Sequence, residues 1–264
     1  MDVRLATHSG HPERGNEDFV GCVPGSVVLL DGAGIPGTES ICHHGVGWYT
    51  HRLGGVLLGR LSRRDGRPLP AVLADAIEEV ADAHRSTCDL SDPSSPQATV
   101  AIVRLTETHL EYLLLADSTL LLGRPGSDPE VLTDGREVAV RRACTAPLAG
   151  LTPGSAAYEA ALPGVKAALR ARRNTPGGYW IAKDDPAVAA EAVTGSTPLR
   201  GLDDAILVSN GVTRLVDPYG AMTWTDLVDL TRNSGPDEVL RFLRSHEPDE
   251  ADRDDATVAR VALP

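Results

Sequence analysis

The chain has 264 residues, of which 42% are hydrophobic and 23% are charged, and this composition is typical of a soluble globular protein rather than of a disordered chain. Acidic residues outnumber basic ones by 37 to 25, which gives a formal net charge of −12, and no segment concentrates basic residues as a nucleic-acid partner requires. No apolar run is long enough to cross a membrane.

The cysteines and the N-terminus indicate a reducing compartment. The four cysteines lie far apart and form no CxxC pair, so neither a disulfide nor a structural zinc site is expected. The N-terminus has no apolar segment after a basic start, which argues against a signal peptide. A cytoplasmic location is therefore expected, and the sequence leaves the oligomeric state open.

The first half of the chain alternates between strand-like and helix-like patterns. Residues 27–30 are all apolar and end in Asp31-Gly32, as expected of a buried strand that enters a turn. Residues 41–61 and 70–85 carry apolar side chains at helical spacing. Three strand-like runs separated by short polar turns then predict an antiparallel meander; they cover residues 98–105, 110–116 and 119–122.

The second half begins with an irregular region at residues 133–175, where Gly and Pro are scattered. We expect this region to be a flap or insertion within a single domain that spans residues 1–264. Strands followed by helices favour an α+β fold over a regular βαβ winding. The further elements expected are a strand at 178–182, a short helix that Asp185-Pro186 begins and Gly195 ends, a strand at 205–209, helices at 224–231 and 236–244, and a last strand at 256–263.

Acidic residues occupy the ends of the predicted strands. Buried carboxylates are costly unless a cation collects them, and Mg²⁺ or Mn²⁺ does so with oxygen ligands. Each acid taken alone is more simply a helix cap or a turn residue, but their shared location favours a metal site. The residues concerned are Glu17-Asp18, Asp31, Asp117, Asp203-Asp204 and Asp254-Asp255.

Two competing motifs are weaker. Residues 32–37 fit the pattern G-x-G-x-x-G, but residues 41–64 contain no Asp or Glu, whereas a dinucleotide site requires an acid about 20 residues further on. His43, His44 and His51 fall on one predicted helix without an acid at ligand spacing. We therefore interpret these histidines as surface or packing residues.

Six short motifs, in this order, resemble the PPM family, the PP2C-type metal-dependent serine/threonine protein phosphatases. The resemblance implies a four-layer α/β/β/α sandwich of two antiparallel sheets flanked by helices. It also implies a hydrolase that binds two Mn²⁺ or Mg²⁺ ions and uses a metal-activated water to hydrolyse phosphate monoesters of phosphorylated proteins. The matching segments are residues 14–18, 30–34, 97–100, 116–119, 209–212 and 254–258, and residues 178–182 are similar to an actinobacterial branch.

The resemblance assigns ligand roles to five positions. Asp31 would be the bridging ligand, Gly32 would offer its backbone carbonyl, and Asp255 matches the late aspartate ligand. Glu17 and Asp18 would hold metal-bound waters or bind the metal directly.

Two further positions carry expectations from the resemblance. Asp117 matches the aspartate that helps bind a third metal in bacterial members. Arg14 either grips the substrate phosphate, for which a guanidinium is suited, or is a solvated surface arginine.

Asn210 departs from the family pattern, in which an aspartate binds metal directly. An amide oxygen can still coordinate a hard cation, but the lost charge should weaken the affinity for at least one ion. Three hypotheses therefore stay open: an active metal-dependent phosphoprotein phosphatase, a pseudophosphatase that acts as a regulatory binding module, and an enzyme of the same fold that acts on a small phosphorylated metabolite.

Overall fold

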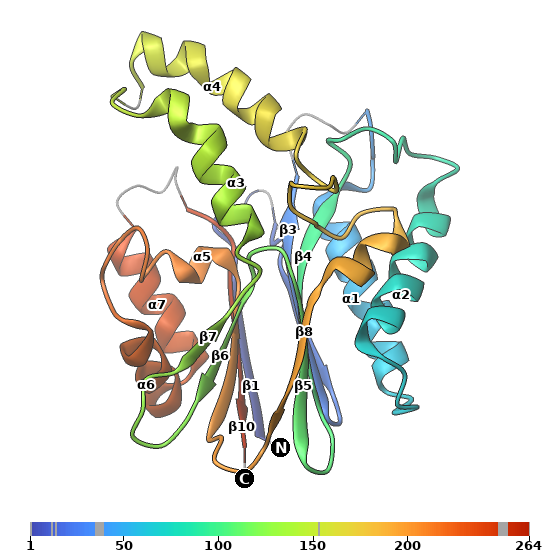
Figure 1. Cartoon of the computed structure of the whole chain (residues 1–264), viewed down its shortest axis with the longest axis vertical. Coiled ribbons are helices and arrows are strands. Elements are labelled where there is room, and N and C mark those ends of the chain that lie inside the picture. The colour runs from blue at the N-terminus through green and yellow to red at the C-terminus, as the bar shows by residue number, and fades with distance from the viewer. Residues whose placement is uncertain are drawn as a thin grey trace.

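Two antiparallel sheets pack face to face, and helices cover the outer face of each sheet (Figure 1). The computed structural model describes residues 2–11, 13, 15–34, 40–152, 154–247 and 253–263. One sheet has the strand order β1-β10-β9-β6-β7 and the other has the order β2-β3-β4-β5-β8. The α+β class and the four-layer α/β/β/α sandwich expected from the sequence are thereby confirmed.

The strands of the first sheet are β1 (Asp2–His8), β10 (Ala256–Ala262), β9 (Asp204–Val208), β6 (Thr119–Gly123) and β7 (Glu130–Leu132). Those of the second sheet are β2 (Phe19–Val23), β3 (Ser26–Ala33), β4 (Gln97–Leu105), β5 (His109–Leu115) and β8 (Val193–Pro198).

Helix pairs form the outer layers. The pair α1 (Gly45–Leu61) and α2 (Leu69–His84) packs on the second sheet, and the pair α6 (Trp224–Ser234) and α7 (Pro236–His246) packs on the first. Among the described residues, no helix is both long and apolar enough to cross a membrane. The remaining helical elements are α3 (Arg136–Thr145), η1 (Ala146–Leu148), α4 (Ala156–Arg170), η2 (Pro186–Glu191) and α5 (Asn210–Thr213).

Strand β3 shows why the apolar run in the sequence is continuous. Successive side chains of a strand point to opposite faces of the sheet. Val27 and Leu29 accordingly lie in the core between the two sheets, while Val28 and Leu30 lie in the core under α1 and α2. Both faces of the sheet are covered, so no polar alternation is required.

The expected meander is wrong at its third strand. Strands β4 and β5 pair as predicted, but β6 pairs with β9 and β7 in the other sheet. The chain crosses between the sheets immediately after β5, where Ala116 has a positive φ of 64°. This crossing places Asp117 in the turn between the two sheets.

The region at residues 133–175 is helical rather than irregular. Helices α3 and α4 lie side by side and project beyond one end of the sandwich (Figure 1). Ser155 caps α4 by accepting a hydrogen bond from the Tyr158 backbone N–H. The scattered Gly and Pro residues therefore lie mostly near the ends of these helices and do not indicate a lack of secondary structure. Pro163 is an exception, because it lies within α4.

The expected strand at 178–182 is also wrong, because these residues form only isolated bridges. The Tyr179 N–H donates to the Arg172 carbonyl (3.1 Å), so the chain folds back locally instead of extending along a neighbour. Asp185 does cap the following turn through the Ala187 N–H. Gly195, however, lies inside β8, where a Cβ atom would clash with the Tyr112 ring.

Candidate metal centre

Asp31, Asp117 and Asn210 meet at one end of the sandwich although they are distant in the sequence. Asp31 ends the buried part of β3, Asp117 lies in the crossing after β5, and Asn210 begins α5 directly after β9. The Asn210 backbone N–H donates to Asp31 Oδ2 (3.0 Å), and its side-chain Nδ2 donates to Asp117 Oδ2 (3.5 Å). The hydrogen bonds thus connect both sheets at this point.

Asp18 lies on the same side and is almost fully buried, with 3% of its surface exposed. Thr257, on β10, donates its hydroxyl proton to Asp18 Oδ2 (2.6 Å). The Asp18 backbone N–H donates to Asn16 Oδ1 (2.9 Å). These contacts hold the carboxylate between β2 and β10.

The adjacent residues Asp254 and Asp255 have different environments. Asp255 accepts hydrogen bonds from the backbone N–H groups of Gly10 (2.8 Å) and Glu17 (2.5 Å), so both of its carboxylate oxygens are engaged by the main chain. Asp254 instead accepts from Arg214 at 2.6 Å. Its charge raises the pKa values of Asp18, Asp31 and Asp117, although the charge of Asp255 acts more strongly on Asp18.

Two glycines allow this arrangement through close backbone contacts. A Cβ atom on Gly10 would lie 2.6 Å from the Asp254 carbonyl carbon, and one on Gly211 would lie 2.1 Å from the Asp255 carbonyl oxygen. The backbone of Asp254 and Asp255 therefore packs directly against Gly10 and Gly211, where there is no room for a side chain. Gly32 is similarly confined, because its Cβ would lie 2.5 Å from the Glu17 carbonyl oxygen.

We call Asp18, Asp31, Asp117 and Asp254 the acidic cluster. Burial raises the pKa of Asp18 to about 7. Burial, and then the charges of the other three members, raise the pKa of Asp31 well above its usual range. Burial also raises the pKa of Asp117, although the nearby Arg141 opposes this shift. The carboxylates of Asp18, Asp31 and Asp117 thus repel one another in a poorly solvated space, and the more exposed Asp254 adds a fourth negative charge.

Two pockets with volumes of about 390 Å³ and 270 Å³ adjoin the acidic cluster. The larger one is lined by Asp117, Asn210, Arg141 and Arg214, and the smaller one by Arg214 and Asp254. Arg141 belongs to α3, and one of its nitrogens lies 3.8 Å from Asp117 Oδ2. Carboxylate oxygens and guanidinium groups thus face the same open space.

The residues present fit a hard divalent cation. The side-chain oxygen Oδ1 of Asn210 is buried and has no hydrogen-bond partner among the described residues. A buried amide oxygen without a partner is costly, and it adjoins two carboxylates whose charge needs compensation. Oxygen donors of this kind are those that Mg²⁺, Mn²⁺ and Ca²⁺ prefer.

Some of the acids singled out in the sequence do not join this centre. Asp204 is buried at the opposite end of β9, where Arg232 Nε and Arg260 Nε each lie 2.7 Å from its carboxylate. Asp203 lies 3.6 Å from Arg232. These acids have a structural role in ion pairs. Arg14 lies outside the described residues.

Three residues beside the acidic cluster were not predicted from the sequence: Glu137, Arg141 and Arg214. Glu137, on α3, is buried, and it lies 2.5 Å from Arg141. Burial and the charge of Asp117 raise the pKa of Glu137 to about 7. The i,i+4 spacing of Glu137 and Arg141 was a readable signal for a helical ion pair, but nothing local indicated that this helix contacts Asp117.

No family model matches the chain, and no curated protein matches it either. Solved structures do match over the full length. The serine/threonine phosphatase Stp1 from Staphylococcus aureus has a TM-score of 0.61 and 15% identity, covering 100% of this chain and 95% of that one. The serine/threonine phosphatase PstP/Ppp from Mycobacterium tuberculosis has a TM-score of 0.61 and 16% identity, with 99% and 98% covered.

A third structure is the catalytic domain of the serine/threonine protein phosphatase PstP in complex with two manganese ions, with a TM-score of 0.63 and 14% identity over 99% of this chain and 97% of that one. The chain has the PP2C phosphatase fold. At these levels of identity the similarity establishes the architecture.

Proposed function

We propose that this protein is a metal-dependent phosphatase that hydrolyses phosphate monoesters on serine and threonine residues of proteins. The observation that carries the proposal is the buried, unpartnered Asn210 Oδ1 beside Asp31 and Asp117. A cation bound beside this buried amide oxygen would give it a partner and thereby stabilise the folded protein. The fold shared with bacterial serine/threonine phosphatases supports the same conclusion.

The ligands we propose for two Mn²⁺ or Mg²⁺ ions are the acidic cluster, the Asn210 amide oxygen and the Gly32 carbonyl. We assign the late ligand position to Asp254 rather than to Asp255, because Asp254 acts electrostatically on Asp31 and Asp117. When bound, the ions would activate a water and stabilise charge on the phosphoryl group.

The other residues of the site have orienting roles in this proposal. Asp255 fixes the loops that carry Gly10 and Glu17, and Glu17 would in turn orient water next to Gly32. Thr257 keeps the Asp18 carboxylate turned toward the cluster through its 2.6 Å hydrogen bond.

Arg141 and Arg214 are our candidates for binding the substrate phosphate. Both line the pocket of about 390 Å³ that Asp117 and Asn210 also line, and a guanidinium binds phosphate oxygens with good geometry. Arg141 belongs to the region at residues 133–175, which we propose is a flap within one phosphatase domain. The flap would therefore contribute directly to substrate binding.

The larger pocket favours a phosphorylated side chain on an extended peptide segment. Its lining combines the arginines with the apolar side chains of Val138, Pro218 and Trp224, and Val138 is 61% exposed. An exposed apolar rim can bind the peptide that flanks a phosphoresidue. A small phosphorylated metabolite would leave this rim uncovered.

The test is phosphate release from a phosphothreonine peptide, p-nitrophenyl phosphate and a panel of phosphometabolites, each with Mn²⁺ or Mg²⁺. We expect the phosphopeptide to be hydrolysed with the highest kcat/KM. Asp31→Asn should lose activity, and Asp203→Asn, which removes the same charge at the other end of the sandwich, should keep it. Equal loss in both variants, or no hydrolysis of any phosphate ester, would contradict the proposal.

Asn210 also supports a second candidate function, a pseudophosphatase that binds phosphoproteins. The amide supplies no charge at a position where the family has a carboxylate, so one ion could bind too weakly for turnover. Calorimetric titration with Mn²⁺ separates the two functions. Two ions bound together with measurable turnover support the phosphatase, whereas a single weak ion and restoration of turnover by Asn210→Asp support the pseudophosphatase.

A further inference from the structure

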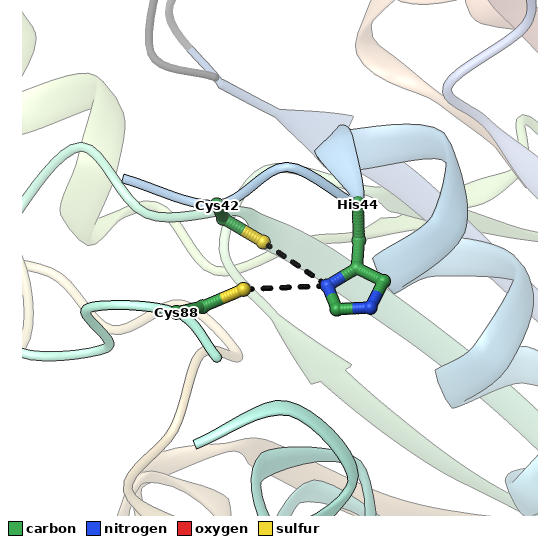
Figure 2. A group of neighbouring side chains, drawn as sticks. All are labelled: Cys42, His44 and Cys88. Carbon is green, nitrogen blue, oxygen red and sulfur yellow. Dashed lines mark hydrogen bonds between the residues drawn. The ribbon is translucent and has the colours of Figure 1, made fainter. Parts of the chain in front are cut away.

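Two cysteines and a histidine meet beside the ends of helices α1 and α2 (Figure 2). Cys42 and His44 lie just before α1, and Cys88 follows the C-terminal end of α2. His44 Nδ1 lies 3.8 Å from Cys42 Sγ and 3.3 Å from Cys88 Sγ. All three atoms lie within 4.8 Å of one another, so two sulfur atoms and one imidazole nitrogen surround a common point.

The backbone holds the two segments together independently of these side chains. The Asp89 N–H donates to the Ile41 carbonyl (2.9 Å), one residue along from each cysteine. The Cys88 N–H donates to the His84 carbonyl (3.0 Å) and continues the last turn of α2. The arrangement is therefore built by the fold.

The separations match those of ligands around a tetrahedral zinc ion. With Zn–S bonds of about 2.3 Å and Zn–N bonds of about 2.0 Å at tetrahedral angles, a sulfur and a nitrogen ligand lie about 3.5 Å apart. The observed distances of 3.8 Å and 3.3 Å bracket this value. A fourth donor is also nearby, since His43 Nδ1 lies 3.8 Å from Cys88 Sγ.

We propose that Cys42, His44 and Cys88 bind one Zn²⁺ ion. The two thiols bind as thiolates and release their protons to solvent on binding. Their negative charges neutralise the ion, so the complete site carries no net charge. Soft thiolate ligands separate this site chemically from the all-oxygen acidic cluster.

The surroundings of His44 favour the neutral imidazole that a metal ligand needs. Its ring stacks on Trp48 with a centroid distance of 4.3 Å, which fixes the ring orientation. Burial and the neighbouring His43 and His84 lower the pKa of His44. Cys42 is buried, whereas His43 is exposed and Cys88 is half-buried, which leaves the ion a route from solvent.

The sequence predicts surface or packing roles for the histidines, and two of them do pack on aromatic rings. His44 packs on Trp48, and His51 packs on Phe19 with ring centroids 5.7 Å apart. The proximity of His44 to two cysteines was not expected, because Cys42 and Cys88 have no CxxC spacing. Only the folded chain brings Cys42, His44 and Cys88 together.

The test uses purified full-length protein that is loaded with ZnCl₂ under reducing conditions, passed through a desalting column and analysed for bound zinc by mass spectrometry. We expect Cys88→Ser to hold one zinc per chain fewer than the wild type. Cys22→Ser is the matched control, because Cys22 is exposed and belongs to β2, and it should retain the zinc. Asp31→Asn should also retain it, which separates this site from the proposed phosphatase centre.

A second measurement does not depend on any variant. Co²⁺ added to the wild-type protein in place of Zn²⁺ should give a thiolate-to-cobalt charge-transfer band in the near ultraviolet, with the intense visible bands of tetrahedral cobalt. Absence of these bands overturns the proposal, as does equal zinc content in wild type and Cys88→Ser. A Cys42–Cys88 disulfide in protein prepared under reducing conditions overturns it as well.

Discussion

Replacing Asn210 by aspartate should destabilise the metal-free protein and should strengthen the binding of metal. Asn210 Nδ2 now donates to Asp117 Oδ2 at 3.5 Å, and the variant places a second carboxylate oxygen at this separation. Two unit charges 3.5 Å apart repel by about 5 kcal/mol at an effective dielectric constant of about 20. In chelator-treated protein at pH 7.5 we therefore expect Asn210→Asp to lose a few kcal/mol of stability.

Addition of Mn²⁺ should reverse the sign of this effect. The added carboxylate attracts the ion, so the variant should bind Mn²⁺ at least about 10-fold more tightly, which corresponds to about 1.4 kcal/mol. Urea unfolding with EDTA or with Mn²⁺ measures the stability, and calorimetric titration measures the affinity. Asn233→Asp adds the same charge on the exposed face of α6 and should change neither. A folded Asn210→Asp variant with unchanged Mn²⁺ affinity would refute the placement of a cation beside position 210.

Three further outcomes follow from the site. In metal-free protein the pKa of Asp18 is about 7, above its ordinary value of 3.8, so this carboxyl stabilises the fold in full below pH 3.8 and loses that effect as the pH rises through 7. Urea unfolding should show that the free energy of unfolding falls by about 2 kcal/mol between pH 5.5 and 7.5. Saturating Mn²⁺ should remove this loss. Thr257→Val removes one of the two hydroxyl donors to the buried Asp18 carboxylate and should destabilise the protein by about 1–3 kcal/mol in the same assay, whereas Thr225→Val, at a more exposed threonine, should not. Arg141→Ala should raise KM for a phosphopeptide about 10-fold or more, as expected for a lost charged hydrogen bond, without weakening Mn²⁺ binding, and a KM equal to that of wild type would exclude contact with the phosphate.

The outer helices and the strands β3, β4, β5, β6, β9 and β10 were predictable because their apolar patterns report burial directly, whereas β1, β7 and β8 were not predicted. Residues 27–30 form a strand whose two faces are both covered, and residues 236–244 lie within an amphipathic helix. The crossing after β5 was not predictable, because the apolar runs on either side look alike whether they pair with each other or with separate sheets. The difference lies in the long-range partner of β6, which is β9.

The position of the acids at strand ends identified most of the candidate site, but it could not choose between neighbours. Asp254 and Asp255 both precede β10, and adjacent residues of an extended chain project in different directions. Only the folded chain shows that Asp255 binds backbone N–H groups while the charge of Asp254 raises the pKa values of Asp31 and Asp117. The same limit applies to Asp204, whose partners Arg232 and Arg260 are supplied by other elements.

The hydrogen bonds at the candidate centre have a mechanical consequence for the sandwich. Asp31 belongs to one sheet and bonds to the residue that follows β9 of the other, while Asp18 and Thr257 form a second bridge between the sheets. Any change in the charge of these carboxylates therefore alters how firmly the two halves of the molecule are clamped at this end. Amide hydrogen exchange in β3 and β9 should consequently slow when the carboxylates are neutralised, even in amides that never touch the ligand.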